Sequence, residues 1–390
     1  MKISIIILNY NVRYFLEQCV LSVQKALENI DGEIIVIDNN SSDDSCTMMK
    51  SRFPNVLLIE NETNTGFPKG NNIGVAQAKG EYLCILNPDT VVAEDTFEKL
   101  IAFAESKTDL GIVGCKLIDG TGNFLPECKR GVPTPFVAFT KVTGLYKMFR
   151  KSKLFGRYYA EHLDENQTGK VDILVGAFMV LQKNLYNHLN GFDETFFMYG
   201  EDIDLSYRSL QSGKNNYYFS ETTVIHYKGE STIKDKKYLQ NFQKAMELFY
   251  QKHFQASVFF DIFMKAGAHL FSIAKKSQKS TLTVKTSQYF LFSDDQNLRI
   301  KVENLLGKKV MLADSTAENS LNSLTKKDCE NIELIFDNNY WSFKSIINFL
   351  EGFKNKGFTF KILPQKSDFI IGSNSTHDRG DVIKVARNKD

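Results

Sequence analysis

The sequence has no long hydrophobic run, almost no net charge and no repeat, and each absence excludes a class of protein. Its 48 Lys and Arg residues nearly balance 46 Asp and Glu residues, which leaves a formal net charge of +2. This balance gives no global signal for nucleic acid, so no nucleic-acid partner is expected. The apolar run at residues 3–8 is far too short for a signal peptide or a membrane span.

Close cysteine pairs are also lacking. The six cysteines are scattered without a CxxC motif, and Cys19 and Cys84 lie in apolar or helical runs, as buried free thiols do. We therefore expect a reduced, cytoplasmic setting. What is present is an ordinary globular composition, with 43% hydrophobic and 24% charged residues. A chain of 390 residues exceeds the size of a single core, so two domains are expected.

Short β-branched runs alternate with helical patterns over the first hundred residues. The pattern predicts strands at residues 3–8, 33–37, 56–59 and 82–86, and helices at 12–29 and 43–52. This rhythm is typical of an α/β fold in which a parallel sheet carries helices on both faces. In such sheets ligands bind beyond the carboxyl ends of the strands.

The chain is expected to divide into a domain at residues 1–275, a polar linker at 276–286 and a smaller α/β domain at 287–390. Further strands are predicted at 288–292, 309–313, 332–336 and 358–363, with helices at 295–306 and 342–356. The last domain resembles a degenerate Rossmann-type unit. The loop after residue 292 lacks the glycines of a dinucleotide site, so a regulatory or protein-contact role is its remaining interpretation.

Polar clusters rich in Asn and Asp follow three of the predicted strands. They are Asn9-Tyr10-Asn11, Asp38-Asn39-Asn40-Ser41-Ser42 and Asn87-Pro88-Asp89. A single cluster of this kind would be a turn. Three clusters at equivalent positions of one sheet predict a cleft, in which Asp89 could offer a hard carboxylate oxygen to Mg²⁺ or Mn²⁺.

Together with later motifs, these clusters resemble family 2 of the glycosyltransferases, and within it the rhamnosyltransferase-like branch. The similarity covers roughly residues 1–230 and is carried by Asn9-Tyr10-Asn11, Asp38-Asn39-Asn40-Ser41-Ser42, Asn64-Thr65-Gly66-Phe67, Asn71-Asn72, Asn87-Pro88-Asp89, Gly191-Phe192-Asp193-Glu194 and Gly200-Glu201-Asp202-Ile203-Asp204. The resemblance implies a GT-A nucleotide-diphospho-sugar transferase fold. It also implies an inverting enzyme that moves a sugar, rhamnose or another hexose, from a nucleotide-diphosphate donor to a hydroxyl of a cell-surface glycan or lipid-linked acceptor.

The resemblance assigns roles to individual residues. The donor-binding positions would be Asn9, Asn11, Asp38, Asn64, Gly66, Phe67, Lys69, Asn71 and Asn87. Asp89 and His226 would hold Mg²⁺ or Mn²⁺ against the donor diphosphate. This chain has Asn87 where the family motif often has its first Asp, so the metal site lacks one carboxylate. Pro68-Lys69 replaces the small residues that are usual there, so Lys69 is a departure from the family pattern.

The acidic pair Glu201-Asp202 opens a helical stretch, and two interpretations stay open. Acidic residues in a first turn are good capping residues. The resemblance instead makes Asp202 the catalytic base, with Glu201 as its orienting neighbour, because a carboxylate can take the proton of an attacking hydroxyl. His226 is likewise either a polar residue at the edge of the core or a ligand that closes the metal site.

Basic and aromatic residues alternate between residues 137 and 159, with six Lys or Arg and no acidic residue. A second apolar stretch at 241–274 is rich in Phe. Both stretches fit a peripheral contact with the inner face of a membrane as well as they fit core packing. Two rival functions, a sugar nucleotidyltransferase and an inactive nucleotide-sugar-binding module, are disfavoured by the missing phosphate loop after residue 8 and by the retained Asp89 and Glu201-Asp202.

Overall fold

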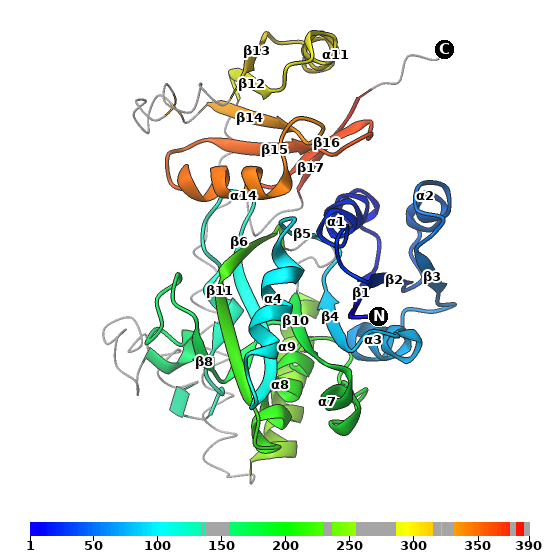
Figure 1. The fold of residues 1–390 in the computed structure, drawn as a ribbon, viewed down its shortest axis with the longest axis vertical. Coiled ribbons are helices and arrows are strands. Elements are labelled where there is room, and N and C mark those ends of the chain that lie inside the picture. The colour runs from blue at the N-terminus through cyan, green and yellow to red at the C-terminus, as the bar shows by residue number, and fades with distance from the viewer. Residues whose placement is uncertain are drawn as a thin grey trace.

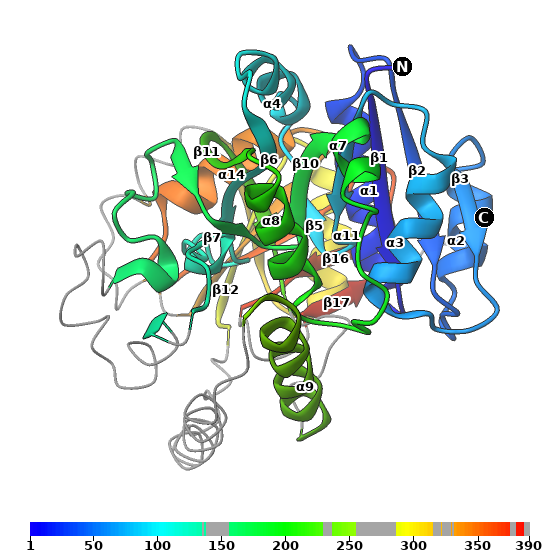
Figure 2. The same cartoon turned by 90° about the horizontal axis from the view of Figure 1, so that it is seen from below.

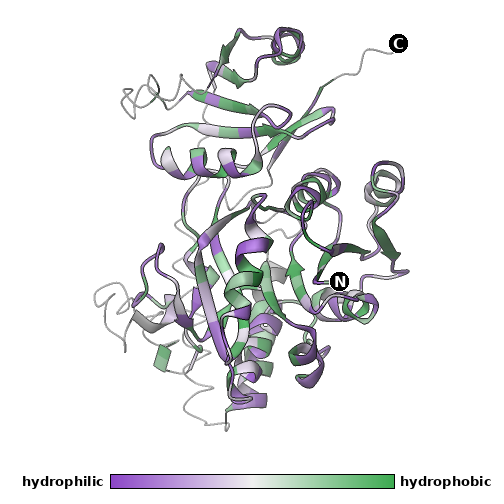
Figure 3. Cartoon of the chain, in the orientation of Figure 1, coloured by the Kyte–Doolittle hydropathy of each residue, from purple (hydrophilic) through white to green (hydrophobic). Residues whose placement is uncertain are grey.

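The computed structural model describes residues 1–134, 136–137, 156–228, 236–254, 286–314, 321, 329, 331–374 and 380–385. Within these residues the chain forms two main sheets, one between residues 3 and 226 and one between 288 and 384. Figure 1 shows the second sheet, coloured yellow to red, stacked at one end of the first. Hydrophobic residues gather on the central strands of both sheets (Figure 3).

The first sheet has nine strands within the described residues. Its order is β3 (Leu57–Glu60), β2 (Gly32–Asp38), β1 (Ile3–Asn9), β4 (Tyr82–Leu86), β10 (Phe178–Gln182), β6 (Leu110–Ile118), β11 (Asn215–His226) and β5 (Thr90–Val91), with β8 (Gly169–Val171) also pairing with β11. The strands predicted in the first hundred residues agree with the observed ones to within one residue. The apolar runs of β1, β2 and β4 explain this agreement, because these strands are mostly buried, whereas β3 lies at the edge of the sheet and is partly exposed.

The predicted parallel pairing is confirmed for β3, β2, β1 and β4, but the sheet as a whole is mixed. β10 lies between β4 and β6 and is antiparallel to both. β11 is parallel to β6, then pairs antiparallel with the short β5, where His226 lies opposite Thr90. This return of a distant strand brings residue 226 to the end of β4, which the sequence pattern could not show.

Helices cover both faces of the first sheet. Figure 1 shows α1 (Arg13–Ala26) and α2 (Ser45–Arg52) on one face of the β1 to β3 region and α3 (Gly66–Gln77) on the other. Further helices are α4 (Thr96–Glu105), α7 (Lys183–His188), α8 (Glu201–Gln211) and α9 (Lys236–His253). The view from below shows α9 beside α8 (Figure 2), and a second core of aromatic and aliphatic residues joins the two.

Smaller elements complete this domain. They are the 3₁₀ turns η1 (Pro126–Cys128) and η2 (Gly156–Tyr159) and the two-stranded ladder of β7 (Lys129–Arg130) with β9 (Ile173–Leu174).

The second sheet has the order β13 (Val310–Ala313), β12 (Gln288–Phe292), β14 (Ile332–Asp337), β15 (Thr359–Leu363), β16 (Phe369–Gly372) and β17 (Asp381–Lys384). The helices are α11 (Gln296–Leu306) and α14 (Phe343–Gly352). The strands from β13 to β15 are parallel, as a Rossmann-type unit requires, but β16 and β17 are antiparallel additions.

One hydrophobic core is shared by the two sheets. It joins Val12, Phe15, Val91 and Ile118 of the first domain to a cluster of phenylalanines in the second. The domain boundaries of the sequence analysis stay a prediction, because residues 255–285 lie outside the described residues. The predicted basic segment is described only at its two ends, and the apolar stretch only up to residue 254. Among the described helices, none combines the length and the apolar character that crossing a membrane requires.

Candidate active site

Asn9 and Asp38 meet at the carboxyl ends of β1 and β2. These strands are parallel and in register, so Asn9 lies opposite Asp38. The Asn9 side-chain amide donates to Oδ1 of Asp38 at 2.7 Å, and the Ser41 backbone N–H donates to Oδ2 at 2.8 Å. Both side chains are buried. The result is a fixed carboxylate at the strand edge, which could accept hydrogen bonds from a nucleoside.

Asn11 ties the first loop to the second. Its backbone has a positive φ of 57°, a conformation that Asn tolerates better than most residues. The Asn11 N–H donates to Ser41 Oγ at 2.9 Å, and its side-chain oxygen accepts from the Ser42 N–H at 2.7 Å. The two loops are therefore linked by hydrogen bonds from both the backbone and the side chain of Asn11.

Asn39 organises the third loop, a role that the sequence analysis missed. Its side-chain oxygen accepts from the Thr65 N–H at 3.0 Å, and its amide donates to Asn64 Oδ1 at 2.9 Å. Asn64 in turn accepts from the Gly66 N–H at 3.0 Å. The position of Asn39, directly after a strand that ends in Asp38, could have indicated a role in the site. Only the fold shows that its partners are Asn64 and Thr65.

The loop at residues 64–72 forms several hydrogen bonds with other parts of the chain. Gly66 has a positive φ of 80°, and the next residue, Phe67, donates its N–H to the carbonyl of Phe197 at 2.9 Å. Asn71 is buried and donates to the Phe67 carbonyl at 2.9 Å. Lys69 is exposed in the first turn of α3. The amides of Gly66 and Phe67 therefore have partners within the chain.

Asp89 and His226 face each other at the end of β4. His226 Nε2 lies 3.4 Å from Asp89 Oδ1 and 3.5 Å from the Asn87 side-chain amide. Both side chains are largely buried, with exposed fractions of 7% for His226 and 6% for Asp89. The Tyr227 N–H donates to the Asp89 carbonyl at 3.0 Å, which fixes the two strands together.

This pair presents one carboxylate and one imidazole, two groups that can ligate a divalent cation. No group of three or more His, Cys, Asp and Glu side chains is arranged for a metal in the described part of the chain. Mg²⁺ is commonly bound by one or two carboxylates with substrate phosphates supplying further oxygens. Asp89 and His226 could provide the protein ligands of such a site. The buried His226 Nδ1 finds no hydrogen-bond partner among the described residues.

Asp202 lies at the start of α8 and accepts three hydrogen bonds. Arg130 Nη2 donates to Oδ2 at 2.8 Å, the Gly176 N–H donates to the same oxygen at 3.1 Å, and the Ile203 N–H donates to Oδ1 at 2.8 Å. The Arg130 side chain is only 14% exposed. Burial is the largest influence and opposes the charge, but Asp202, Tyr158 and Glu127 together outweigh it and raise the pKa of Arg130. The sequence analysis missed Arg130, which lies outside every motif that it used.

Glu201 has a different environment from its neighbour. Burial, reinforced by the Asp202 carboxylate, raises the pKa of Glu201 to about 8. One of its oxygens is buried and has no hydrogen-bond partner among the described residues. Glu201 is therefore mostly protonated at neutral pH, whereas Asp202 has a cationic partner. Two adjacent carboxyl groups with such different environments are suited to different roles.

Asp204, the second Asp of this motif, is a structural residue. It is fully buried and accepts from Arg208 at 2.7 Å and from His253 at 2.7 Å. Burial alone would raise the pKa of Asp204, but His253, Lys252 and Arg208 together lower it. Asp204 thus joins α8 to α9.

The segment Gly176-Ala177 brings these clusters together. The Gly176 N–H bonds Asp202, and the Ala177 carbonyl accepts from the Asn87 N–H at 3.0 Å. A Cβ atom at position 176 would lie 3.4 Å from both Asp202 Cβ and Phe67 Cζ, which is ordinary van der Waals contact and shows that both side chains lie beside this residue. The acidic pair of α8, the Asn87-Pro88-Asp89 turn and the Phe67 loop therefore meet at one place.

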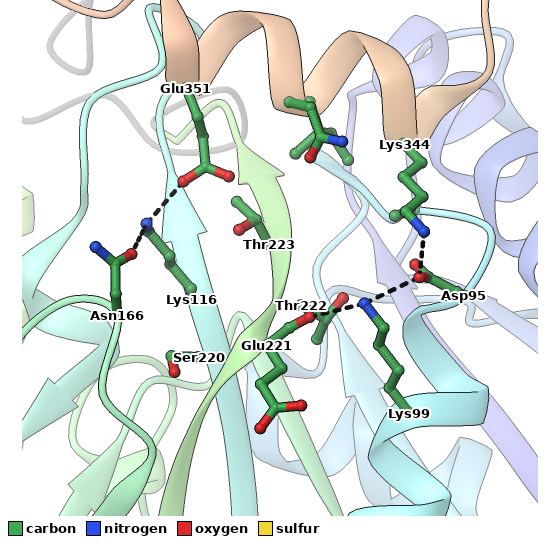
Figure 4. A pocket seen from close by; sticks show the side chains of 13 residues that line it. Asp95, Lys99, Lys116, Asn166, Ser220, Glu221, Thr222, Thr223, Lys344 and Glu351 are labelled. Atoms are coloured by element: carbon green, nitrogen blue, oxygen red, sulfur yellow. Dashed lines mark hydrogen bonds and ion pairs between the residues drawn. The ribbon is translucent and has the colours of Figure 1, made fainter.

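Among the described residues two further clefts open, and one of them reaches this site at Arg130. One of about 300 Å³ is lined by Arg130, His162, Lys170 and Asp172 among others. The other, of about 240 Å³, lies where α14 meets α4 and β11 (Figure 4). Its lysines already pair within the protein, as Lys116 does with Glu351 at 2.7 Å. Neither cleft is lined by the predicted donor-binding residues.

Comparison with known proteins identifies the first domain. Residues 4–189 match the family described as "Glycosyl transferase family 2". The chain carries a family 2 glycosyltransferase domain. The α/β fold of GT-A type predicted from the sequence is confirmed, as is the glycosyltransferase class.

Similar curated proteins include two bacterial rhamnosyltransferases. The "N-acetylglucosaminyl-diphospho-decaprenol L-rhamnosyltransferase" of Mycobacterium tuberculosis is 25% identical over 244 residues, which are 60% of this chain and 78% of that protein. "Rhamnosyltransferase WbbL" of Escherichia coli is 28% identical over 222 residues, which are 53% of this chain and 78% of that protein. A solved structure, "Mannosyltransferase PcManGT from Pyrobaculum calidifontis in complex with GDP-Man and Mn2+", is 14% identical and covers 72% of this chain and 76% of its own, with a TM-score of 0.47.

Proposed function

We propose that this family 2 glycosyltransferase moves a sugar, rhamnose or another hexose, from a nucleoside diphosphate donor to a hydroxyl of a glycan or lipid-linked acceptor. The observation that carries the proposal is the meeting of Asp202, Asn87 and Phe67 at the segment Gly176-Ala177. The curated relatives, named as rhamnosyltransferases of which one uses a diphospho-decaprenol acceptor, support the substrate class. A lipid-linked acceptor would place the enzyme in the cytoplasm at the inner face of a membrane.

The donor side of the site uses the first two loops. Asp38, fixed by Asn9 and Ser41, would accept hydrogen bonds from the nucleoside, and Asn11 keeps both loops in position. Asp89 and His226 would hold Mg²⁺ or Mn²⁺, and when bound the cation neutralises charge on the departing diphosphate. Asn87 positions that pair through its contacts with His226 and Ala177.

The acceptor side of the site uses Asp202. An ionised carboxylate is the form that takes a proton, and Arg130 complements its charge. Glu201, buried and mostly protonated at neutral pH, is unsuited to this task. A single base that faces the sugar opposite the leaving diphosphate permits one displacement, which inverts the anomeric configuration.

A panel of nucleotide sugars tests the proposal. Each would be incubated with the chain, with and without Mn²⁺, and its binding and hydrolysis followed by calorimetry and by release of the nucleoside diphosphate. We expect one sugar nucleotide to bind more tightly with the cation than without it. A chain that binds none of them under either condition does not have the proposed function.

A further inference from the structure

We propose that the C-terminal domain positions the donor-binding loop at residues 9–13, and that Phe369 and Arg52 are the positioning residues. The inference rests on the proposed function, in that it takes this loop to bind the donor nucleotide. It assigns to the second domain a role in donor affinity rather than a ligand of its own.

The donor-binding loop runs directly into the interface between the domains. Arg13 donates its N–H to Asp43 Oδ2 at 3.0 Å, so the start of α1 is bonded to the same second loop that holds Asn11. The neighbouring residues Val12 and Phe15 are buried in the core shared with the second domain. A displacement of the second domain would therefore move Val12 and Phe15, and with them the adjacent donor-binding loop at residues 9–13.

Phe369 contacts this turn through Tyr14 and Arg13. Its ring lies edge-on to Tyr14, with centroids 4.9 Å apart. The Arg13 guanidinium lies 4.2 Å from the Tyr14 ring centroid and 5.5 Å from that of Phe369. On the other side, Lys384 lies 5.5 Å from the Tyr14 ring centroid. Stacking of this kind contributes to packing and orients the guanidinium.

A buried carboxylate extends the contact to α2. Glu17 is 1% exposed and pairs with Arg13 at 3.0 Å and with Arg52 at 2.7 Å. Arg52 in turn donates to the carbonyl of Lys366 at 2.7 Å, in the loop that precedes β16. Removing one arginine leaves the buried Glu17 carboxylate with a single cationic partner, which is destabilising, so we expect both ion pairs to be kept in the folded chain.

The second domain has another attachment that does not reach the donor-binding loop. At the N-terminus of α14, the Phe343 and Lys344 N–H groups donate to the two Glu94 oxygens, both at 2.8 Å. Lys344 also pairs with Asp95 at 2.7 Å (Figure 4). A carboxylate therefore occupies the helix terminus at which α/β domains often bind phosphate. This attachment provides a matched control.

The test compares Phe369→Leu and Arg52→Gln with the control Lys344→Met in the full chain. The donor is the sugar nucleotide that the panel selects. We expect the first two variants to raise the donor KM and the calorimetric dissociation constant roughly tenfold with kcat nearly unchanged, the scale of a lost packing contact. Lys344→Met should change neither quantity.

Melting temperatures establish that each variant is folded, and Arg52→Gln tests the idea if Phe369→Leu does not fold. Wild-type donor affinity in both folded variants would overturn the inference. An equal loss of donor affinity in Lys344→Met would also overturn it, as would a decrease of kcat alone in Phe369→Leu and Arg52→Gln. If the parent chain binds no sugar nucleotide, the proposed function fails and this inference fails with it. If the parent binds and the variants bind equally well, only this inference fails.

Discussion

Arg130 donates to Asp202 at 2.8 Å although 72 residues separate them, and this pair is the main electrostatic contact of the proposed base. Arg130→Met should lower turnover roughly tenfold to a hundredfold, because the carboxylate loses a charged partner and its orientation. Arg130→Lys should restore part of the loss, and donor affinity should be retained in both. Turnover and calorimetric affinity check this; a Met variant with full turnover would remove Arg130 from the mechanism.

Asp202→Asn should abolish proton acceptance with almost no change in size. Turnover is expected to fall roughly a hundred- to ten-thousand-fold, the usual contribution of a general base, with donor binding largely preserved. The anomeric configuration of the product, measured by NMR on the parent enzyme, should be inverted. A retained configuration would contradict a single displacement, and near-normal turnover in Asp202→Asn would contradict its role.

Asp89→Ala should remove the effect of the cation on donor binding. With Mn²⁺ present, the variant should bind the sugar nucleotide more weakly than the parent, because a carboxylate ligand to the cation is lost. Without any cation, variant and parent should bind alike. Calorimetry under both conditions checks this, with Asp95→Asn at the domain interface as the control. A difference that persists without cation would indicate a direct contact with the donor.

Glu201 should make stability depend on pH. Its pKa is raised to about 8 in the folded chain, so between pH 4.5 and pH 8 the folded state keeps a proton that the unfolded state has lost. The free energy of unfolding should therefore decrease as pH rises through this window. Glu201→Gln, which stays neutral, should remove this decrease, on the order of a few kcal/mol. Urea denaturation of parent and variant at pH 5 and pH 8 measures this decrease. If the free energy of unfolding falls as much in Glu201→Gln as in the parent, the raised pKa of Glu201 is contradicted.

Limited proteolysis should cut within the polar linker predicted at residues 276–286, but the products should stay together. The reason is the shared core, in which Val12, Phe15 and Ile118 are covered by the second domain. After nicking, both fragments are expected to co-elute on size exclusion and to separate only in denaturant. Fragments that separate under native conditions would show that the interface is too weak to hold the domains.

The sequence by itself determined the α/β class, the strands that end in polar clusters and the candidates Asp38, Asp89 and Asp202. It could do so because a strand buried on both faces must be a continuous apolar run, and because the polar residues after it are nearby in the chain. The family motifs lie in such local stretches. Their order along the chain was enough to predict the GT-A type.

Only the tertiary structure decided which residues meet. Arg130 lies on a two-residue strand with no periodic signal, and its partner Asp202 is brought to it by the packing of α8. Three carboxyl groups in one helical turn have different environments: that of Glu201 has a raised pKa, that of Asp202 is bonded to Arg130, and that of Asp204 has a lowered pKa. These differences depend on burial and on partners far away in the sequence, so the local sequence cannot reveal them. The same holds for Phe369 against Tyr14: contacts between segments far apart in sequence form only when both domains have folded.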